Sequence, residues 1–81
     1  MEIGYVLFKI KPGYKKAFIK KVRKIVNVKE ARLVIGIFDA IARIEAESIE
    51  GLESIYYNKL DKLSGVIDSH LYIVACPRTR K

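Results

Sequence analysis

Thiol, imidazole and indole groups are scarce in this sequence, which contains one cysteine, one histidine and no tryptophan. With Cys76 alone, neither an internal disulfide nor a cysteine-based metal cluster can form, and a thiol at the end of an apolar strand is expected to be inert. No charged segment followed by a cleavable apolar one opens the chain, so no signal peptide is expected. The longest uncharged run is much shorter than the roughly 18 residues that span a bilayer. These absences predict a cytoplasmic protein that does not associate with membranes.

Groupings of side chains that are typical of catalysis are also missing. There is no glycine-rich phosphate loop and no histidine spacing of a metal site. None of the serines has the sequence context of a nucleophile elbow (Ser48, Ser54, Ser64 and Ser69). His70 could act as an acid or base near neutral pH, or it could simply pack at an interface. The sequence therefore predicts no enzyme, no metal and no cofactor.

Positive charge is concentrated in the N-terminal part of the chain. Residues 1–32 contain ten Lys and Arg against two acids, residues 33–77 contain three against seven, and the net charge is +7. A basic surface is typical of proteins that bind nucleic acid or another anion. It is equally typical of a solvated helix face that keeps an apolar domain in solution. Under the first interpretation the anion would contact the basic C-terminal tail (residues 77–81) and four residues of the first helix: Lys16, Lys20, Arg23 and Lys24.

Hydrophobic periodicity predicts the order strand, helix, strand, strand, helix, strand. Pro12 and Gly13 end the first strand, Ser48 is a good N-cap for the second helix, and Gly65 is a good left-handed stop for it. The predicted strands cover residues 2–10, 28–36, 39–46 and 65–76, and the predicted helices cover residues 14–26 and 48–65. Two right-handed βαβ units in this order give an α+β, ferredoxin-like fold, in which a four-stranded antiparallel sheet carries both helices on one face.

Residues 1–76 are expected to form this single domain, and residues 77–81 a basic tail. The face of the sheet without helices should be polar in a monomer, but it is predicted to be apolar. Ile3, Tyr5 and Leu7 alternate with a second apolar set in the first strand, and Tyr72 and Val74 do so in the last. In a chain of 81 residues only another copy can supply the cover. We therefore expect a face-to-face homodimer of the dimeric α/β-barrel type.

The stretch "VIGIFDAIARIEA" (residues 34–46) places a lone carboxylate in an apolar run. Because Gly36 interrupts the run, we expect two antiparallel strands with Asp39 near their connection. Asp39 could accept hydrogen bonds from nearby backbone N–H groups of the turn, or it could hold the ammonium group of a ligand. The second of these strands has no aromatic residue, so sequence-specific RNA reading of the RNA-recognition type is not expected.

Three segments, quoted at the end of this paragraph in their order along the chain, resemble the C-terminal ligand-sensing (RAM) domain of the Lrp/AsnC transcriptional regulators, and the resemblance covers Met1 to Ala75. The most specific features are the Pro12–Gly13 turn, the Gly-x-aromatic-Asp loop and the glycine–valine pair before the last strand. The segments are "YVLFKIKPGYKKAFIKKVRKI", "VKEARLVIGIFDAIARIEAES" and "LDKLSGVIDSHLYIV".

This resemblance implies sheet-to-sheet dimers that assemble into octamers or decamers, with an amino-acid effector bound between dimers. It also implies the residues of the effector site, which are Gly36, Ile37, Phe38 and Asp39 in the loop, with Ser69 and His70 from the last strand. A glycine allows the backbone to approach a ligand carboxylate closely. The 81 residues contain no helix-turn-helix of the family type, so we expect a stand-alone module that modulates transcription or amino-acid metabolism. Full-length regulators of the family are possible partners, and direct operator recognition is not expected.

Overall fold

The computed structural model describes residues 1–75, so the predicted tail (77–81) and Cys76 lie outside the described residues. The elements follow the predicted order, and a π-helical segment continues the second helix. They are β1 (Glu2–Ile10), α1 (Lys15–Val22), β2 (Val28–Leu33), β3 (Ala40–Ala46), α2 (Ile49–Ile55), η1 (Tyr56–Leu60) and β4 (Val66–Ile73). Within the described part of the chain, no helix is long and apolar enough to cross a membrane.

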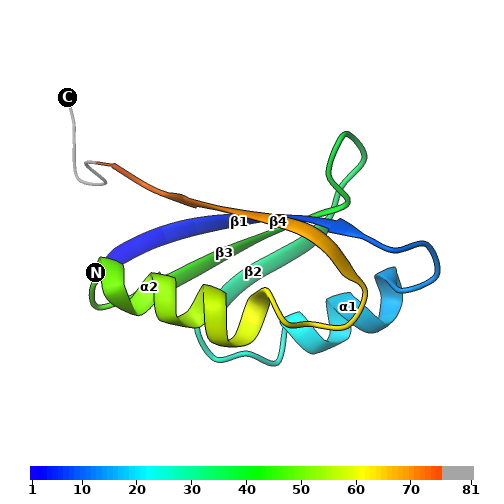
Figure 1. The fold of residues 1–81 in the computed structure, drawn as a ribbon. Helices are drawn as coiled ribbons and strands as arrows, with labels where there is room; N and C mark the ends of the chain where they lie inside the picture. Colours follow the sequence, from blue (N-terminus) through cyan, green and yellow to red (C-terminus); the bar gives the residue numbers. More distant parts are fainter. Residues whose placement is uncertain (76–81) are drawn as a thin grey trace.

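The four strands form one sheet in the order β2-β3-β1-β4, and all three pairs of neighbours are antiparallel. Both helices lie against one face of the sheet, and the β2–β3 connection rises on the opposite side (Figure 1). This arrangement confirms the predicted ferredoxin-like fold. It also leaves β2 and β4 as the two edge strands.

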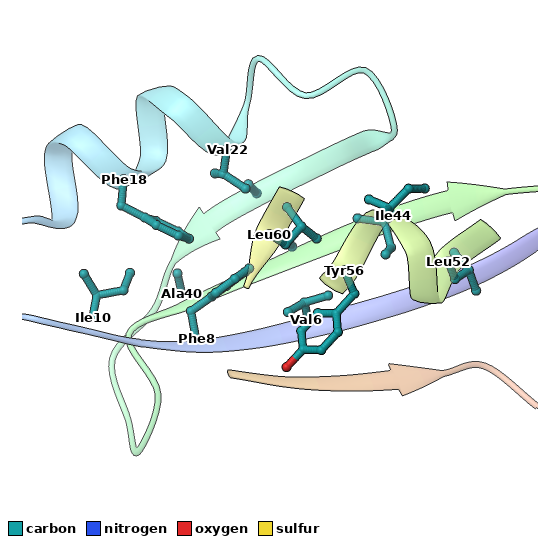
Figure 2. Close-up of a cluster of buried hydrophobic side chains, with 13 residues drawn as sticks. Val6, Phe8, Ile10, Phe18, Val22, Ala40, Ile44, Leu52, Tyr56 and Leu60 are labelled. Atoms are coloured by element: carbon teal, nitrogen blue, oxygen red, sulfur yellow. The ribbon is translucent and has the colours of Figure 1, made fainter. Parts of the chain in front are cut away.

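The core lies between the helices and the inner face of the sheet (Figure 2). Alternate residues of β1 point inward, and Val6 and Phe8 are completely buried. Phe8 meets Phe18 of α1 edge to face, with ring centroids 4.7 Å apart. Small residues of the facing strands, such as Ala40 and Ala42, are almost fully buried and leave room for these rings. The core therefore depends on large side chains from β1 and the helices over small ones on β3.

The first helix is shorter than predicted, because α1 ends at Val22 rather than at residue 26. Beyond it the chain turns tightly: Ile25 N–H donates to the Val22 carbonyl (3.2 Å), and Val28 N–H to that of Ile25 (3.0 Å). β-Branched residues have restricted rotamers in helices, and here two of them, Ile25 and Val26, stand just where the helix stops. Ala17, which the periodicity placed on the buried face, is exposed.

The predicted start of the second helical segment is confirmed, but its predicted end is wrong: the segment ends at Leu60, and Gly65 lies in the turn just before β4. The Ser48 hydroxyl accepts a hydrogen bond from Gly51 N–H at 3.0 Å, which satisfies one of the otherwise unpaired donors of the first turn. Gly65 adopts a φ of +89° after the segment. The buried stripe includes Leu52, Tyr56 and Leu60, as the spacing predicted.

Gly65 and Gly13 form a matched pair for testing packing beside a left-handed backbone. Their φ angles are +89° and +90°, but a Cβ on Gly65 would lie 2.6 Å from Tyr14 Cβ, whereas one on Gly13 meets nothing within 4 Å. Gly13→Ala should cost about 1–2 kcal/mol from the backbone alone. Gly65→Ala adds overpacking, which typically costs about 1–3 kcal/mol more. Urea denaturation of the two variants measures the difference, and equal midpoints would contradict the packing effect.

The face of the sheet opposite the helices, called here the free face, is apolar along the first part of β1 and the end of β4. Tyr5 lies opposite Arg43 on one side and Tyr72 on the other, and Leu7 lies opposite Ile41. Tyr72 remains 59% exposed. The apolar part of the free face contains the five residues predicted from the sequence, Ile3, Tyr5, Leu7, Tyr72 and Val74, and Ile41 of β3 adds a sixth.

Polar and charged residues occupy the rest of the free face, as ion pairs along β2 and β3 and as Lys9, Asp68 and His70 at the end of β1 and in β4. Glu30 pairs with Arg32 on β2, and Arg43 pairs with Glu45 on β3. A shallow hollow of about 140 Å³ lies between these side chains and Tyr5. The free face thus combines an apolar strip with a flank of ion pairs that are already satisfied within the chain.

Candidate functional site

The loop between β2 and β3, residues 34–39, projects from the sheet on the side of the free face (Figure 1). Its apolar side chains have little cover within the chain: Ile35 is fully exposed and Ile37 is 79% exposed. Because exposed apolar surface of this kind marks contact sites, this loop is the most evident interaction site of the described chain. Gly36 lies between the two isoleucines and so belongs to the loop, not to the end of a strand as the sequence predicted.

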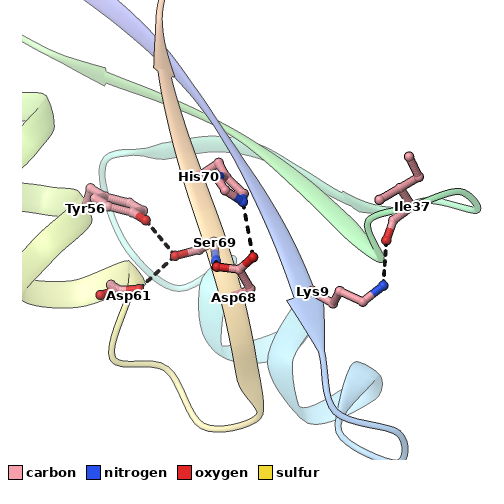
Figure 3. A network of polar contacts seen from close by, with 7 residues as sticks. All are labelled: Lys9, Ile37, Tyr56, Asp61, Asp68, Ser69 and His70. Carbon is pink, nitrogen blue, oxygen red and sulfur yellow. Dashed lines mark hydrogen bonds and ion pairs between the residues drawn. The ribbon is translucent and has the colours of Figure 1, made fainter.

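Phe38 and His70 are brought together, as the resemblance implied for two members of one site. Their rings meet edge to face with centroids 5.4 Å apart. On the other side, His70 Nε2 lies 3.2 Å from a carboxylate oxygen of Asp68. Lys9 Nζ donates to the Ile37 carbonyl at 2.9 Å, which ties the loop to the end of β1 (Figure 3). The sequence analysis missed Lys9 and Asp68, and the alternation of β1 and β4 on one face was the signal that could have found them.

Asp39 does not make the local turn contacts that the sequence favoured. Its Oδ2 accepts a hydrogen bond from Ile10 N–H at 2.8 Å, although the two residues are 29 positions apart. Its Oδ1 lies 3.5 Å from Lys15 Nζ at the start of α1. The hydrogen bond from Ile10 holds the pKa of Asp39 below its usual value of 3.8; partial burial opposes this effect and Lys15 adds to it. Asp39 therefore links the β2–β3 loop to the end of β1.

The low pKa of Asp39 predicts an acid-dependent loss of stability. A carboxyl group whose pKa is lower in the folded state stabilises the protein above its unfolded pKa, and this contribution disappears as the pH falls through the folded value. Since the folded pKa lies below 3.8, Asp39→Asn should lower the urea midpoint at pH 7, and the difference from wild type should shrink below about pH 4. Glu53→Gln, which also replaces a carboxylate by an amide but at an exposed position, is the matched control and should leave the urea midpoint unchanged. A constant difference across this range would contradict the role of the Asp39 charge.

Ser69 faces the helical layer, away from His70. Its hydroxyl lies 2.7 Å from Tyr56 Oη and donates to a carboxylate oxygen of Asp61 at 2.7 Å (Figure 3). Because successive residues of a strand point to opposite faces, Ser69 and His70 cannot share one pocket within a single chain. Tyr56 is buried, and its hydroxyl group finds a polar partner in Ser69. This network fixes the start of β4 to the end of the second helical segment.

The four basic residues of the alternative interpretation divide into two groups. Lys16, Lys20 and Lys24 are exposed on and just after α1. Arg23 instead donates from Nε and Nη2 to the Ala31 carbonyl of β2, at 3.1 and 2.8 Å. Its guanidinium group has a structural role that the sequence did not reveal. Among residues 1–75, no group of three or more His, Cys, Asp and Glu side chains could hold a metal ion.

The model of the Lrp/AsnC ligand-binding domain family matches residues 4–77 of this chain. A search of curated protein sequences found no match. Solved structures share the fold at low identity. TTHA0845 from Thermus thermophilus is 20% identical, with a TM-score of 0.90, over 99% of this chain and 100% of that one.

Two longer proteins share the fold over about half of their length. AsnC from E. coli is 18% identical, with a TM-score of 0.84, over 99% of this chain and 55% of that one. A transcriptional regulator from Neisseria meningitidis, NMB0573 in complex with L-Met, is 16% identical, with a TM-score of 0.84, over 98% and 53%. The family match covers nearly the whole chain and describes a ligand-binding module, not an enzyme. The chain therefore belongs to the Lrp/AsnC family, as a ligand-binding domain of that family of regulators.

Proposed function

We propose that this domain senses an amino acid that binds at an interface between copies of the chain, beside the loop of residues 34–39. The observation that carries the proposal is the exposure of Ile35 and Ile37 on the side of the free face, next to the contact of Phe38 with His70. A loop with this apolar surface is stabilised when a second copy covers it. An effector bound there would change the contacts between copies, and through them transcription or amino-acid metabolism.

The chemistry of the loop suits an amino acid. Gly36 leaves open space, since a Cβ there would meet nothing within 4 Å, so backbone amides of the loop are accessible to a carboxylate. The Asp39 carboxylate is the candidate partner for the ammonium group. It accepts from Ile10 N–H and lies 3.5 Å from Lys15 Nζ, and a carboxylate has further lone pairs for a ligand. The L-Met complex of the related fold supports an amino-acid effector.

Residues of β4 enter the proposal in two ways. His70 contacts Phe38 and can meet the effector directly, from this copy or from a neighbour. The Ser69 hydroxyl is occupied by Tyr56 and Asp61, so its proposed contribution is to hold β4 in the position that places His70. Ile37 supplies apolar surface to the site, which favours an effector with an apolar side chain.

The assembly we propose begins with a homodimer through the free faces and continues to an octamer or decamer through the loops. Full-length regulators of the family could join through the same faces. The apolar strip of Tyr5, Leu7 and Tyr72 meets its own copy across a two-fold axis, as in other isologous interfaces. The flanking ion pairs are satisfied within each chain, so this contact leaves no charge of theirs unpaired.

Calorimetric titration with each of the twenty amino acids, combined with a mass measurement with and without the effector, tests the proposal. We expect one or a few amino acids to bind, and the mass to exceed that of a monomer. Phe38→Ala should weaken binding by about tenfold or more, because truncation of a contacting aromatic typically costs at least about 1–2 kcal/mol. A monomeric mass and no binding by any amino acid would refute both parts of the proposal.

A further inference from the structure

The densest cluster of positive charge on the described surface lies on α1 and the turn after it, on the helical layer. Residues 3–29 contain nine Lys and Arg and no acid. Four lysines of this segment are exposed and take part in none of the side-chain ion pairs, hydrogen bonds and ring contacts among residues 1–75, whereas Lys9 and Lys29 each donate to a backbone carbonyl. We call them the α1 lysine patch: Lys16, Lys20, Lys21 and Lys24.

The neighbouring cations differ from the patch, because each has a partner within the chain. Lys15 Nζ lies 3.5 Å from Asp39, Arg23 is bonded to the Ala31 carbonyl, and Lys11 lies over the Tyr14 ring. In the patch, Lys16 and Lys20 are one helical turn apart, about 6 Å along the axis. Lysines at this spacing repel each other and weaken the helix. An anionic partner would relieve that repulsion.

The composition of the patch indicates which class of anion it fits. Protein–protein contacts have an apolar or aromatic centre and are depleted in lysine. Within α1 the aromatic side chain, Phe18, is buried, and the exposed ring of Tyr14 at its N-cap is covered on one side by Lys11. Single-stranded nucleic acid is bound largely by base stacking on aromatic side chains, which the helix also lacks. Contact with the phosphates of a duplex requires only positioned cations.

We propose that the α1 lysine patch binds the phosphate backbone of double-stranded nucleic acid without reading its sequence. The patch lies on the helical layer, and the proposed homodimer forms through the opposite face (Figure 1). Both surfaces of one domain can therefore be occupied together. This second activity depends on neither the effector nor the Asp39 loop.

Fluorescence anisotropy with labelled 20-base-pair DNA and RNA duplexes tests the proposal on the full chain. If all four lysines contact phosphates, the affinity of the wild-type chain should fall about 100-fold when the salt is raised from about 50 to 200 mM. The K16Q/K20Q variant loses two contacts, so over the same change in salt its affinity should fall only about 10-fold. K16R/K20R keeps the charges and should bind as wild type does. Equal affinity for the DNA and RNA duplexes identifies the phosphates as the target. Tighter binding of one of the two duplexes identifies which nucleic acid the patch fits. Failure to bind either duplex at low salt would overturn the proposal.

A second pair of variants separates the patch from the net charge. E50Q/E53Q removes two exposed acids from α2, and should leave affinity within about twofold of wild type. The quadruple variant K16Q/K20Q/E50Q/E53Q loses two positive and two negative charges and so keeps the net charge of +7, but it should bind as weakly as K16Q/K20Q. Binding that follows the net charge instead would refute a localised patch. Equally tight binding of poly-glutamate would assign the surface to an acidic polypeptide and overturn the proposal.

Discussion

The Tyr72→Lys variant is expected to be a folded monomer under conditions in which the wild-type chain is a dimer or larger. Tyr72 is 59% exposed within one chain and pairs with Tyr5 across β4 and β1 on the free face. A lysine there is tolerated in a monomer, because its ammonium group reaches water. In a face-to-face dimer the same charge is buried near its own copy, and loss of a central aromatic residue typically costs about 2–4 kcal/mol of binding. Sedimentation or mass photometry measures the change.

Tyr57→Lys is the matched control, because Tyr57 is 60% exposed but lies on the helical layer. Its ring meets Tyr56 edge to face at 5.0 Å, and loss of this contact is worth about 0.5–1.5 kcal/mol of stability. It should leave the mass unchanged. Tyr72 and Tyr57 are equally exposed in one chain, so if the free face is the interface only the Tyr72 variant should become a monomer. An identical mass for the two variants and the wild type would contradict this interface.

Phe18→Ala should have the largest effect on folding of the substitutions considered. Phe18 is 1% exposed and packs on Phe8 at 4.7 Å. Removal of a buried phenylalanine typically costs about 3–5 kcal/mol, and a domain of 81 residues has a total stability of only about 4–12 kcal/mol. The variant should therefore be largely unfolded or close to it. Urea denaturation followed by circular dichroism at a fixed protein concentration measures the loss.

Phe38→Ala provides the comparison, because Phe38 is half-buried in the loop and contacts His70 rather than the core. Its loss should cost about 1 kcal/mol, as for a single aromatic pair. It should reduce effector binding instead. A Phe18→Ala variant that unfolds at the same urea concentration as Phe38→Ala would contradict the position of the core.

The order of the elements and the fold were predictable because hydrophobic period and turn chemistry agree along this chain. Ser48 at the start of α2 and Gly65 after η1 are local signals that need no tertiary information. The end of α1 was not predictable to the residue, because Ile25 continues the apolar period although it lies in the turn after the helix. The tight turn there depends on the start of β2, which is a tertiary constraint.

Contacts between side chain and backbone far apart in the sequence were the part that sequence reasoning could not supply. Asp39 has the composition of a turn residue, but its partner is the backbone of Ile10. Ser69 was assigned to a ligand site by resemblance, and in the described chain its hydroxyl meets Tyr56 and Asp61. Backbone N–H groups and buried hydroxyls have no signature in a single sequence, so such pairs emerge only once the fold brings them together.

The contact of Arg23 with β2 has a consequence for how the sheet can grow. Val34 N–H donates to the Asp39 carbonyl at 2.9 Å, so in the alternation of an antiparallel pair the Ala31 carbonyl points away from β3, to the open edge. Arg23 occupies that carbonyl with two hydrogen bonds. A strand from another molecule would have to displace the guanidinium before it could extend the sheet, and unprotected edges are where proteins aggregate. At this edge the chain is protected against fibre-like growth, while its free face stays open to a second copy.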